Sequence, residues 1–585
     1  MNVLRAVIAA VEEEGAKLAA ELYLPEGPRG RRGHAPIDTE IEERLRAKLQ
    51  ALVGCPFTGE ETGVAPGRDA ARADWLWLVD PHDGTFDFIQ GKRGSSISVA
   101  LLRACVPVLG VVHSPCAPDR GADTVAWAEG APLTRNGAPV KADLARRRLE
   151  PGEFIWTNSG SALRPETFSR AALPARYVAM PSIAYRLARV AAGDGAAALT
   201  VHGINEYDSA AGLALVQAAG GVLLDAQGRE VVLTGKPEAR VEGCFAGSRE
   251  AAGRLCSFPW GELEQEPKKP VRVHLGYPRK ADEARVARAA GCLLGQVIGD
   301  SLGSRVEFKG AAEIAREFPQ GVRELADGGV YRLIAGQPTD DSEMALALAR
   351  SLVRHRGFVR DEVLAAYRAW LQSRPVDVGA TTERGLLGLH TTESESNGSL
   401  MRVSPIGVWA AGDPARAAAT AREDSALTHP NPVCVEACAG YSAAIAAGVA
   451  GAGREAMRDA ALAHCAGRAR EAIAQGAGGK PHAEYEKQIG WVLIALQNAF
   501  YCLFRPGSVE EALVETVGRG GDTDTNAAIA GALMGAAFGR EAFASRWVLP
   551  VLACRPMAEA GALRPRPVEC WPDDLLELAE ALLNT

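Results

Sequence analysis

This chain contains no Cys-x-x-Cys motif. The twelve cysteines are scattered, and the closest pair, Cys434 and Cys438, lies about one helical turn apart. The absence of a Cys-x-x-Cys motif argues against structural zinc and favours reduced thiols, as in a cytosolic protein. Apolar runs that approach the ~20 residues of a membrane span are also missing.

Residues 1–20 have the pattern of an amphipathic helix, and Glu12, Glu13 and Glu14 within it argue against a signal peptide. The formal net charge of −8 provides no broad positive surface for nucleic acid or an anionic membrane. We therefore expect a cytoplasmic location, no membrane contact and no nucleic-acid partner.

The chain has 585 residues, more than one hydrophobic core normally supports, so two or three domains are expected. Residues 1–257 mix helical patterns with strand patterns, and the expected strands are 75–79, 96–102, 106–113 and 221–225. In residues 281–585, alanine, leucine and arginine recur at helical periodicity and strand signals almost vanish. The prolines and charges of residues 258–280 predict an exposed linker, with the domain boundary near residue 270.

An acidic turn follows the expected strand 75–79. Its sequence is Asp80-Pro81-His82-Asp83-Gly84-Thr85. The spacing lets the carboxylates of Asp80 and Asp83 reach one ion, while the backbone carbonyl of His82 supplies a further oxygen. Taken alone, each acid is better explained as a turn or helix cap. Together with acids elsewhere in residues 1–257, the turn predicts a metal site.

This turn and two other segments resemble the inositol monophosphatase family of Mg²⁺-dependent, lithium-sensitive phosphatases. The other matching segments are Gly59-Glu60-Glu61 and Asp208-Ser209-Ala210-Ala211-Gly212. The resemblance implies an α/β layered sandwich of the αβαβα type and a site with two or three Mg²⁺ ions. The implied metal ligands are Glu60, Asp80, the carbonyl of His82, Asp83 and Asp208. The implied catalytic residues are Glu60, Thr85 and Asp38, of which Thr85, paired with Asp38, positions the attacking water.

Two departures from the family pattern concern the phosphatase substrate. Inositol-specific members place a carboxylate seven residues before the last aspartate, where this chain has Val201. Asp87 replaces the asparagine that usually follows the threonine. These changes argue against inositol. A nucleotide or sugar phosphate, as in the related 3′(2′),5′-bisphosphate nucleotidases, is at least as well supported.

Two oxygen-rich helix starts occur in the helical half of the chain. Thr339-Asp340-Asp341 precedes an expected helix at 342–353, and Asp522-Thr523-Asp524-Thr525 precedes another at 526–538. One such start is explained by helix capping. Two starts, each with three or four clustered oxygens, supply about enough ligands for a pair of Mg²⁺ ions that share a carboxylate.

A loop from Ser396 to Arg402 combines a flexible backbone with a following helix, and it either cradles a pyrophosphate or forms an ordinary turn. His429, in Thr428-His429-Pro430, indicates by itself a structural role rather than a catalytic one.

These segments, with residues 295–308, resemble the ADP-ribosylglycohydrolase family (the dinitrogenase-reductase-activating glycohydrolase type). The resemblance implies an all-α orthogonal helical domain that cleaves the bond between the anomeric carbon of ADP-ribose and a leaving group. Two Mg²⁺ ions are implied, held by Thr339, Asp340, Asp341, Asp522, Asp524 and Thr525. The implied ligand-binding residues are Ser396, Asn397, Gly398, Met401 and His429. The implied catalytic residues are Asp341 and Glu307, the latter as a gating or acid-base carboxylate.

Every metal-binding acid expected from either family is present, so the leading hypothesis is a bifunctional Mg²⁺-dependent hydrolase. Its substrates would be an ADP-ribosylated protein or small molecule and a phosphomonoester, including a phosphorylated ADP-ribose derivative that links the two reactions. Two alternatives stay open: a phosphatase-like half that only binds, and a sensor that holds ADP-ribose or a nucleotide without turnover. A homodimer is expected by analogy with phosphatases of the first family.

Overall fold

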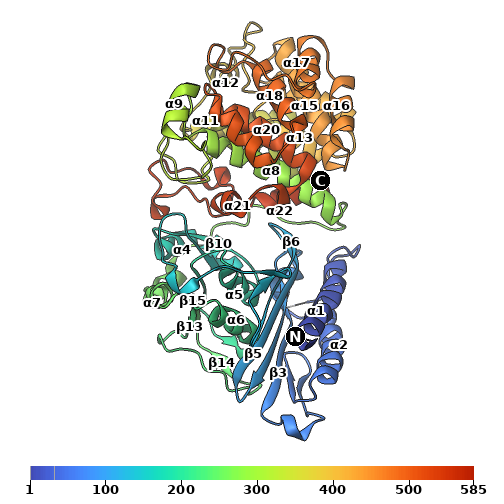
Figure 1. Ribbon diagram of the computed structural model, residues 1–585. Helices are drawn as coiled ribbons and strands as arrows, with labels where there is room; N and C mark the ends of the chain where they lie inside the picture. The colour runs from blue at the N-terminus through green and yellow to red at the C-terminus, as the bar shows by residue number, and fades with distance from the viewer. Residues whose placement is uncertain (1, 32) are drawn as a thin grey trace. The chain divides into compact units, whose positions relative to one another are not determined.

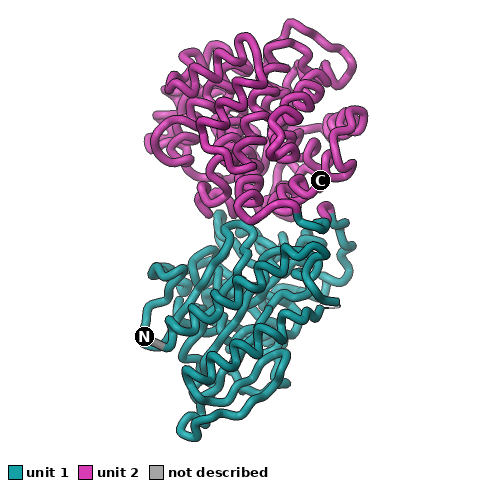
Figure 2. Tube along the Cα trace, turned by 90° about the vertical axis from the view of Figure 1, so that its right-hand side faces the viewer, with its two compact units in different colours: residues 1–271, 275–279 teal, residues 272–274, 280–585 magenta. Residues whose placement is uncertain are grey.

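The computed structural model (Figure 1) describes residues 2–31 and 33–585. Met1, where the first helix was expected to begin, lies outside the described residues. The chain divides into two compact units: unit 1 comprises residues 1–271 and 275–279, and unit 2 comprises residues 272–274 and 280–585 (Figure 2). The segment expected as a linker is therefore divided between the units, and its short helix η4 (Trp260–Gln265) places Leu263 in a core of unit 1.

Unit 1 alternates helical layers and sheets, as the αβαβα expectation states (Figure 1). Helices α1 (Asn2–Glu21) and α2 (Pro36–Leu52) cover one face of an eight-stranded sheet of order β2-β1-β3-β4-β5-β6-β7-β8. Helices α5 (Ile183–Ala191) and α6 (Glu206–Ala218) lie between this sheet and a five-stranded sheet of order β10-β9-β11-β15-β13. The last layer contains α4 (Pro165–Ala172) and α7 (Arg249–Cys256).

The central strands of the larger sheet are buried on both faces because helices cover both sides. Three of the expected strands form β3, β4 and β5, and the fourth forms β13. The strands of this sheet are β1 (Phe57–Gly59), β2 (Gly63–Ala65), β3 (Trp75–Asp83), β4 (Ser96–Arg103), β5 (Val106–Ala117), β6 (Gly121–Ala128), β7 (Thr134–Arg135) and β8 (Ala138–Pro139).

The smaller sheets of unit 1 lie in its C-terminal half. The five-stranded sheet contains β9 (Phe154–Thr157), β10 (Arg176–Ala179), β11 (Ala197–Thr200), β13 (Val222–Leu224) and β15 (Cys244–Gly247). Strands β12 (Ile204–Asn205) and β14 (Arg240–Val241) pair separately. The remaining short helices are η1 (Ala70–Arg72), α3 (Thr85–Phe88), η2 (Leu144–Arg146) and η3 (Ser159–Leu163).

Unit 2 is built from helices, and none of its described residues belongs to a named strand, which confirms the all-α expectation. The helices are α8 (Glu283–Gly303), α9 (Ala311–Glu317), α10 (Asp340–His355), α11 (Arg360–Gln372), α12 (Ala380–Leu386), α13 (Ser404–Trp409), α14 (Pro414–Ser425), α15 (Pro432–Val449), α16 (Arg454–Ala463), α17 (Gly467–Ala477), α18 (Val492–Phe504), α19 (Val509–Gly518), α20 (Thr523–Phe538), η5 (Arg540–Ala542), α21 (Ser545–Leu552), η6 (Ala558–Ala560), η7 (Val568–Cys570) and α22 (Leu575–Asn584).

Helix α15 is long and apolar enough to cross a membrane by length and composition, although no such run was expected from the sequence. Within unit 2, 72% of this helix is buried, and it packs against α13, α14 and α20. Its apolar character is thus accounted for by its place in the core of unit 2.

Helices α8 and α20 form the closest helix pair of unit 2. Small residues at four-residue spacing on α8 face small residues on α20, in the pairs Gly291–Gly535, Gly295–Gly531 and Gly299–Ala527. A Cβ atom on Gly295 would lie 2.1 Å from the carbonyl oxygen of Gly531. The two backbones are therefore in direct contact, and on α8 this contact leaves no room for a Cβ atom at Gly291, Gly295 or Gly299.

We predict that Gly295→Ala destabilises unit 2, because the added Cβ forces α8 and α20 apart. Overpacking of this kind costs about 1–3 kcal/mol, which thermal unfolding of the full-length protein would detect. The matched control is Gly518→Ala on α19, where an added Cβ meets no heavy atom within 4 Å and stability should be unchanged or slightly higher. Equal melting temperatures for Gly295→Ala and the wild type would contradict the prediction.

Candidate functional sites

The described residues of unit 2 bring six carboxylates to one cavity of about 290 Å³. These side chains are Glu307, Asp340, Asp341, Asp377, Asp522 and Asp524. All the residues expected to hold ADP-ribose, namely Ser396, Asn397, Gly398, Met401 and His429, line the same cavity, as does Thr525. The structure therefore joins the two acidic helix starts and the Ser396–Arg402 loop, which are far apart in the sequence.

Two groups of three acids, drawn from the lining of this cavity and from Asp300 next to them, approach closely enough to share a cation. Asp300, Asp341 and Asp524 each place one oxygen within 4.8 Å of the others, and Glu307, Asp522 and Asp524 do the same. Every member is buried. Because Asp524 belongs to both groups, the arrangement fits two neighbouring ions that share one carboxylate.

Two buried oxygens in these groups have no protein partner. Asp341 Oδ1 and Glu307 Oε2 make no hydrogen bond. Burial and the neighbouring carboxylates raise the pKa of Asp341 and that of Asp524 well above the ordinary aspartate value. Buried, mutually repelling acids with unpartnered oxygens are the donor set that a hard divalent cation neutralises. The residues present thus fit Mg²⁺.

The two helix starts are placed by backbone geometry. Asp340 is the first residue of α10, and Thr339 is its N-cap. Helix α20 begins at Thr523 rather than at residue 526, so Asp524 and Thr525 lie in its first turn. The turn before α20 uses two consecutive left-handed glycines, Gly520 at φ 74° and Gly521 at φ 77°. Residues other than glycine rarely adopt this conformation.

Asp300 is a site residue that the sequence analysis did not single out. It lies on α8 and accepts hydrogen bonds from the backbone N–H of Thr339 at 3.1 Å and of Ser342 at 3.1 Å. The hydroxyl of Thr339 lies 2.9 Å from Asp300 Oδ1. The same hydroxyl lies 3.2 Å from Asp341 Oδ2, and whichever carboxylate accepts its proton, the Thr339 oxygen keeps its lone pairs for another partner. Nothing near Asp300 in the sequence marks it, because its partners come from α10 and α20.

The Ser396–Arg402 loop, which was expected to bind ADP-ribose, lines the cavity and also hydrogen-bonds to one of its acids, Asp522. Asn397 Nδ2 donates to Asp522 Oδ2 at 2.7 Å. A Cβ on Gly398 would lie 2.6 Å from Thr382 Oγ1 and 2.9 Å from the ring of His429. Arg402, the last loop residue, is fully buried in an ion pair with Asp424 and does not reach the cavity.

His429 is buried between two hydroxyls. Its Nδ1 lies 2.7 Å from Thr428 Oγ1 and its Nε2 lies 3.0 Å from Ser396 Oγ. Burial, with the charge of Arg402, lowers the pKa of His429 to about 3, so the imidazole is neutral near pH 7. His429 orients the Ser396 end of the loop by hydrogen bonding.

Glu307 and Asp377 lie at the same side of the cavity. Burial, followed by the charges of Asp522 and Asp377, raises the pKa of Glu307 to about 8. Asp377 was not singled out from the sequence; it lies in the loop between α11 and α12, and its charge also raises the pKa of Asp340. Phe308, exposed and at φ 63°, and Ile489 border the opening with apolar surface.

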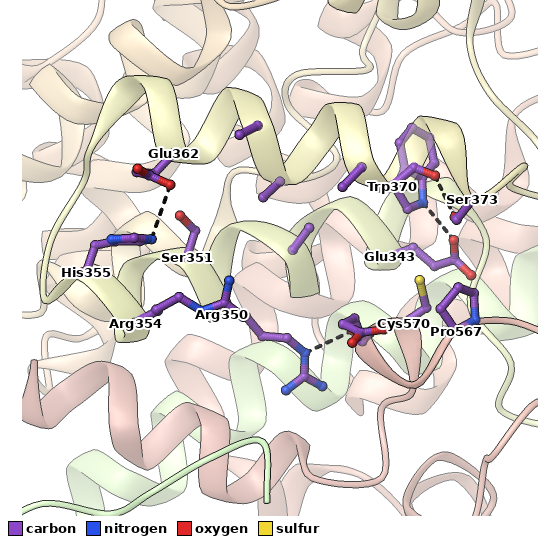
Figure 3. Close-up of a pocket in the computed structure, with 15 residues that line it drawn as sticks. Glu343, Arg350, Ser351, Arg354, His355, Glu362, Trp370, Ser373, Pro567 and Cys570 are labelled. Carbon is purple, nitrogen blue, oxygen red and sulfur yellow. Dashed lines mark hydrogen bonds and ion pairs between the residues drawn. The ribbon is translucent and has the colours of Figure 1, made fainter. Parts of the chain in front are cut away.

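A second cavity of unit 2, about 440 Å³, lies between α10 and α11 (Figure 3). Most of its charged side chains already have protein partners, in the pairs Glu343 with Arg566, Arg350 with Asp574 and His355 with Glu362. Alanines of both helices line much of the remainder. Among the described residues, neither group of three close acids lies here. The acidic cavity is therefore the candidate site of unit 2.

In unit 1, strand β3 does not end at Val79 as expected but continues to Asp83, so the acidic segment forms its C-terminal end. The pairing of β3 with β4 shifts register between Asp80 and Asp83. Asp80 is buried, and burial together with the charges of Glu60, Asp83 and Asp208 raises its pKa well above the ordinary value. Asp83 Oδ2 accepts the backbone N–H of Ala184, in the first turn of α5, at 2.7 Å.

Asp208 lies in the third position of α6 rather than at its first, because the helix begins at Glu206. Its Oδ2 accepts the backbone N–H of Asn205 at 2.8 Å. Among the described residues, no three acids of unit 1 bring ligand oxygens within 4.8 Å of one another. Its carboxylates are close enough to raise one another's pKa, but they are less tightly gathered than those of unit 2.

The hairpin that carries Glu60 depends on Glu42, a residue that sequence reasoning missed. The buried Glu42 carboxylate accepts the backbone N–H groups of Glu61 at 2.9 Å and Thr62 at 2.6 Å. A Cβ on Gly59 would lie 2.3 Å from the carboxyl carbon of Glu42. Gly59 is thus required by this close approach.

Asp38, Thr85 and His82 form one hydrogen-bonded group. The Thr85 hydroxyl lies 3.2 Å from Asp38 Oδ2 and 2.7 Å from the backbone oxygen of His82. The His82 side chain, for which sequence reasoning gave no role, lies 2.6 Å from Asp38 Oδ1 through its Nδ1. The expected pairing of Thr85 with Asp38 is therefore present in the geometry.

Comparison with known protein families supports the assignment of both unit 1 and unit 2. Residues 281–585 match the family model of ADP-ribosylglycohydrolase, and residues 31–257 match that of the inositol monophosphatase family. The chain therefore belongs to the ADP-ribosylglycohydrolase family through unit 2 and to the inositol monophosphatase family through unit 1. Both are families of hydrolases.

Individual relatives cover one half of the chain each. ADP-ribosyl-dinitrogen reductase glycohydrolase of Rhodospirillum rubrum is 32% identical over 273 residues, which are 45% of this chain and 89% of that protein. ADP-ribosylarginine hydrolase Tri1 of Pseudomonas putida is 25% identical and covers 49% of this chain and 86% of its own length. The probable inositol 1-monophosphatase ImpA of Mycobacterium tuberculosis is 33% identical over 203 residues, 33% of this chain and 71% of that protein.

We predict that the metal-free protein loses stability as pH rises from 4.5 to about 8. The folded-state pKa of Glu307, about 8, lies above its ordinary value of 4.5. The proton on Glu307 therefore stabilises the folded protein at low pH, and this stabilisation is lost as pH rises from 4.5 to about 8. Thermal unfolding with a chelator across this window checks the slope, and added Mg²⁺ should stabilise most at its upper end.

Glu307→Gln should flatten this pH dependence, whereas Glu313→Gln, an exposed glutamate on α9, should leave it unchanged. A melting temperature that rises with pH in the chelated wild type would contradict the prediction.

Proposed function

We propose that the protein is a bifunctional Mg²⁺-dependent hydrolase. Unit 2 hydrolyses the ribosyl bond of an ADP-ribosylated substrate, and unit 1 hydrolyses a phosphomonoester. The observation that carries the first activity is the pair of buried acid groups that share Asp524 and leave oxygens unpartnered. The second activity rests on the turn that places Asp80 and Asp83 beside the Asp38–Thr85 pair.

In unit 2, the two ions would be held by Thr339, Asp340, Asp341, Asp522, Asp524 and Thr525. Two of these ligand residues are held in place by hydrogen bonds, Thr339 by Asp300 and Asp522 by Asn397. Bound Mg²⁺ would orient the ribose hydroxyls and acidify the attacking water. Glu307 lines the cavity with an unpartnered Oε2, so it is the carboxyl group placed to exchange a proton with the leaving group.

The acceptor from which ADP-ribose is removed is proposed to be cationic. Asp377 also lines the cavity and belongs to neither of the two groups of three close acids. Its half-buried carboxylate can pair with a guanidinium leaving group. The name of the Pseudomonas putida relative, an ADP-ribosylarginine hydrolase, supports the same choice. ADP-ribosylarginine is therefore the first substrate to test.

In unit 1, Glu60, Asp80, the His82 carbonyl, Asp83 and Asp208 would hold two or three Mg²⁺ ions, which supply charge for the phosphoryl group and acidify water. The Thr85 hydroxyl would orient the attacking water and pass a proton to Asp38 Oδ2, 3.2 Å away. The phosphomonoester is proposed to be a nucleotide or sugar phosphate, since Val201 provides no carboxylate for inositol hydroxyls. A phosphorylated ADP-ribose derivative would serve both units.

We predict that Asp341→Asn lowers ADP-ribose release by about 10- to 100-fold, because it replaces a buried carboxylate, whose Oδ1 has no protein partner, by a neutral amide that binds a cation more weakly. Phosphate release should be unchanged in this variant. Asp80→Asn should have the reciprocal effect. Both activities are measured on the full-length protein with Mg²⁺, using ADP-ribosylarginine and a panel of nucleotide and sugar phosphates.

The outcomes separate the alternatives. Release of ADP-ribose without phosphate from any panel compound would support a phosphatase-like half that only binds. Binding of ADP-ribose without turnover at either site would support a sensor and overturn the proposed function. If the two units acted only on compounds that are unrelated to each other, a shared substrate would be ruled out.

A further inference from the structure

The His82 side chain is buried against Asp38 in unit 1. Its exposed fraction is 1%, and its Nδ1 lies 2.6 Å from Asp38 Oδ1. Because carboxylates accept and the imidazole N–H donates, this contact places a proton on Nδ1. The family motif assigns only the backbone carbonyl of His82, so this contact is an additional feature of the site.

Asp38 uses its two oxygens for different partners. Oδ1 accepts from His82, whereas Oδ2 faces the Thr85 hydroxyl at 3.2 Å and the backbone N–H of Ala35 at 3.3 Å. The Thr85 hydroxyl has one proton and two acceptors within reach, Asp38 Oδ2 and the backbone oxygen of His82. The orientation of the Asp38 carboxylate therefore decides whether Oδ2 can accept that proton.

Packing alone does not explain a histidine at this position. Its Nε2 is buried with no hydrogen-bond partner, and its ring makes an edge contact with Phe88 at a centroid distance of 4.4 Å. A leucine would fill similar space without leaving a buried polar atom unsatisfied, which costs free energy. The benefit that offsets this cost is the short hydrogen bond to Asp38.

We propose that His82 is a positioning residue of the phosphatase site. By holding Oδ1, its imidazole fixes the plane of the Asp38 carboxylate so that Oδ2 stays directed at Thr85, the residue that orients the attacking water. This inference rests on the proposed phosphatase function of unit 1. It concerns only the Asp38–Thr85 pair, and the metal ligands are unaffected because the backbone carbonyl of residue 82 is kept by any substitution.

Two substitutions of His82 separate hydrogen bonding from shape. In His82→Asn, the side-chain amide nitrogen takes the place of Nδ1 and can still donate to Asp38. In His82→Leu, a methyl group takes that place. We expect His82→Leu to lower kcat for phosphate release by about 10- to 100-fold, as loss of a supporting hydrogen bond does, with KM unchanged. His82→Asn should retain kcat within a few-fold of the wild type.

A second buried histidine provides the matched control. His113 lies on β5, where its Nδ1 is 2.9 Å from Thr124 Oγ1, outside the proposed site. His113→Asn should change the melting temperature without changing kcat. Calorimetry with Mg²⁺ alone should give equal affinities for the wild type, His82→Leu and His82→Asn.

A readout independent of turnover is the imidazole proton itself. In metal-free protein labelled at histidine, a proton in a short hydrogen bond to a carboxylate gives a far-downfield N–H resonance. We expect one such signal from His82, absent in His82→Leu and shifted in Asp38→Asn.

Wild-type kcat in a folded His82→Leu variant would overturn the positioning role, and so would equal losses in His82→Leu and His82→Asn. Wild-type protein that releases no phosphate from p-nitrophenyl phosphate, a 3′,5′-bisphosphate nucleotide or a sugar phosphate would instead overturn the proposed function. The positioning role of His82 would then fall with it, whether or not the downfield signal is present.

Discussion

The site of unit 2 depends on the direct contact between the backbones of α8 and α20. The glycine pairs along these helices end at Gly303, where a Cβ would lie 2.4 Å from the Cα of Asp524. This closeness brings Asp300 of α8 beside Asp524 of α20, and Asp524 belongs to both groups of metal-binding acids. Larger side chains would separate the helices and, with them, the carboxylates. The small residues therefore determine the spacing on which the chemistry of this unit relies.

Both units tolerate buried negative charge by the same physical means. Asp83 accepts a backbone N–H at the start of α5, and Asp300 accepts two at the start of α10. Helix N-termini present unpaired N–H groups and a partial positive charge, which stabilise a nearby carboxylate. The pKa values of Asp341 and Asp80 are nevertheless raised by burial and neighbouring acids, and Asp341 Oδ1 has no hydrogen-bond partner, as expected where a cation is part of the site.

Much of the fold and part of each site could be predicted because the signals are local. Strands β3 to β5 and the starts of α10 and α20 are marked by composition and by clustered acids and hydroxyls. Asp300, Asp377 and Glu42 were missed because nothing in the surrounding sequence distinguishes them from other acids of the chain. Their roles arise from contacts with distant segments: Asp300 with α10, Asp377 with Glu307, and Glu42 with the hairpin at residues 59–63.

The sequence by itself determined the two-part organisation, the α/β and all-α classes, and the residue types that can hold Mg²⁺, since these follow from periodicity and local motifs. Tertiary structure alone decided which oxygens converge, because the distance between two carboxylates depends on packing between elements far apart in the chain. It also decided that the His82 side chain reaches Asp38, across 44 positions of sequence. A motif specifies which groups are available, and packing specifies which of them meet.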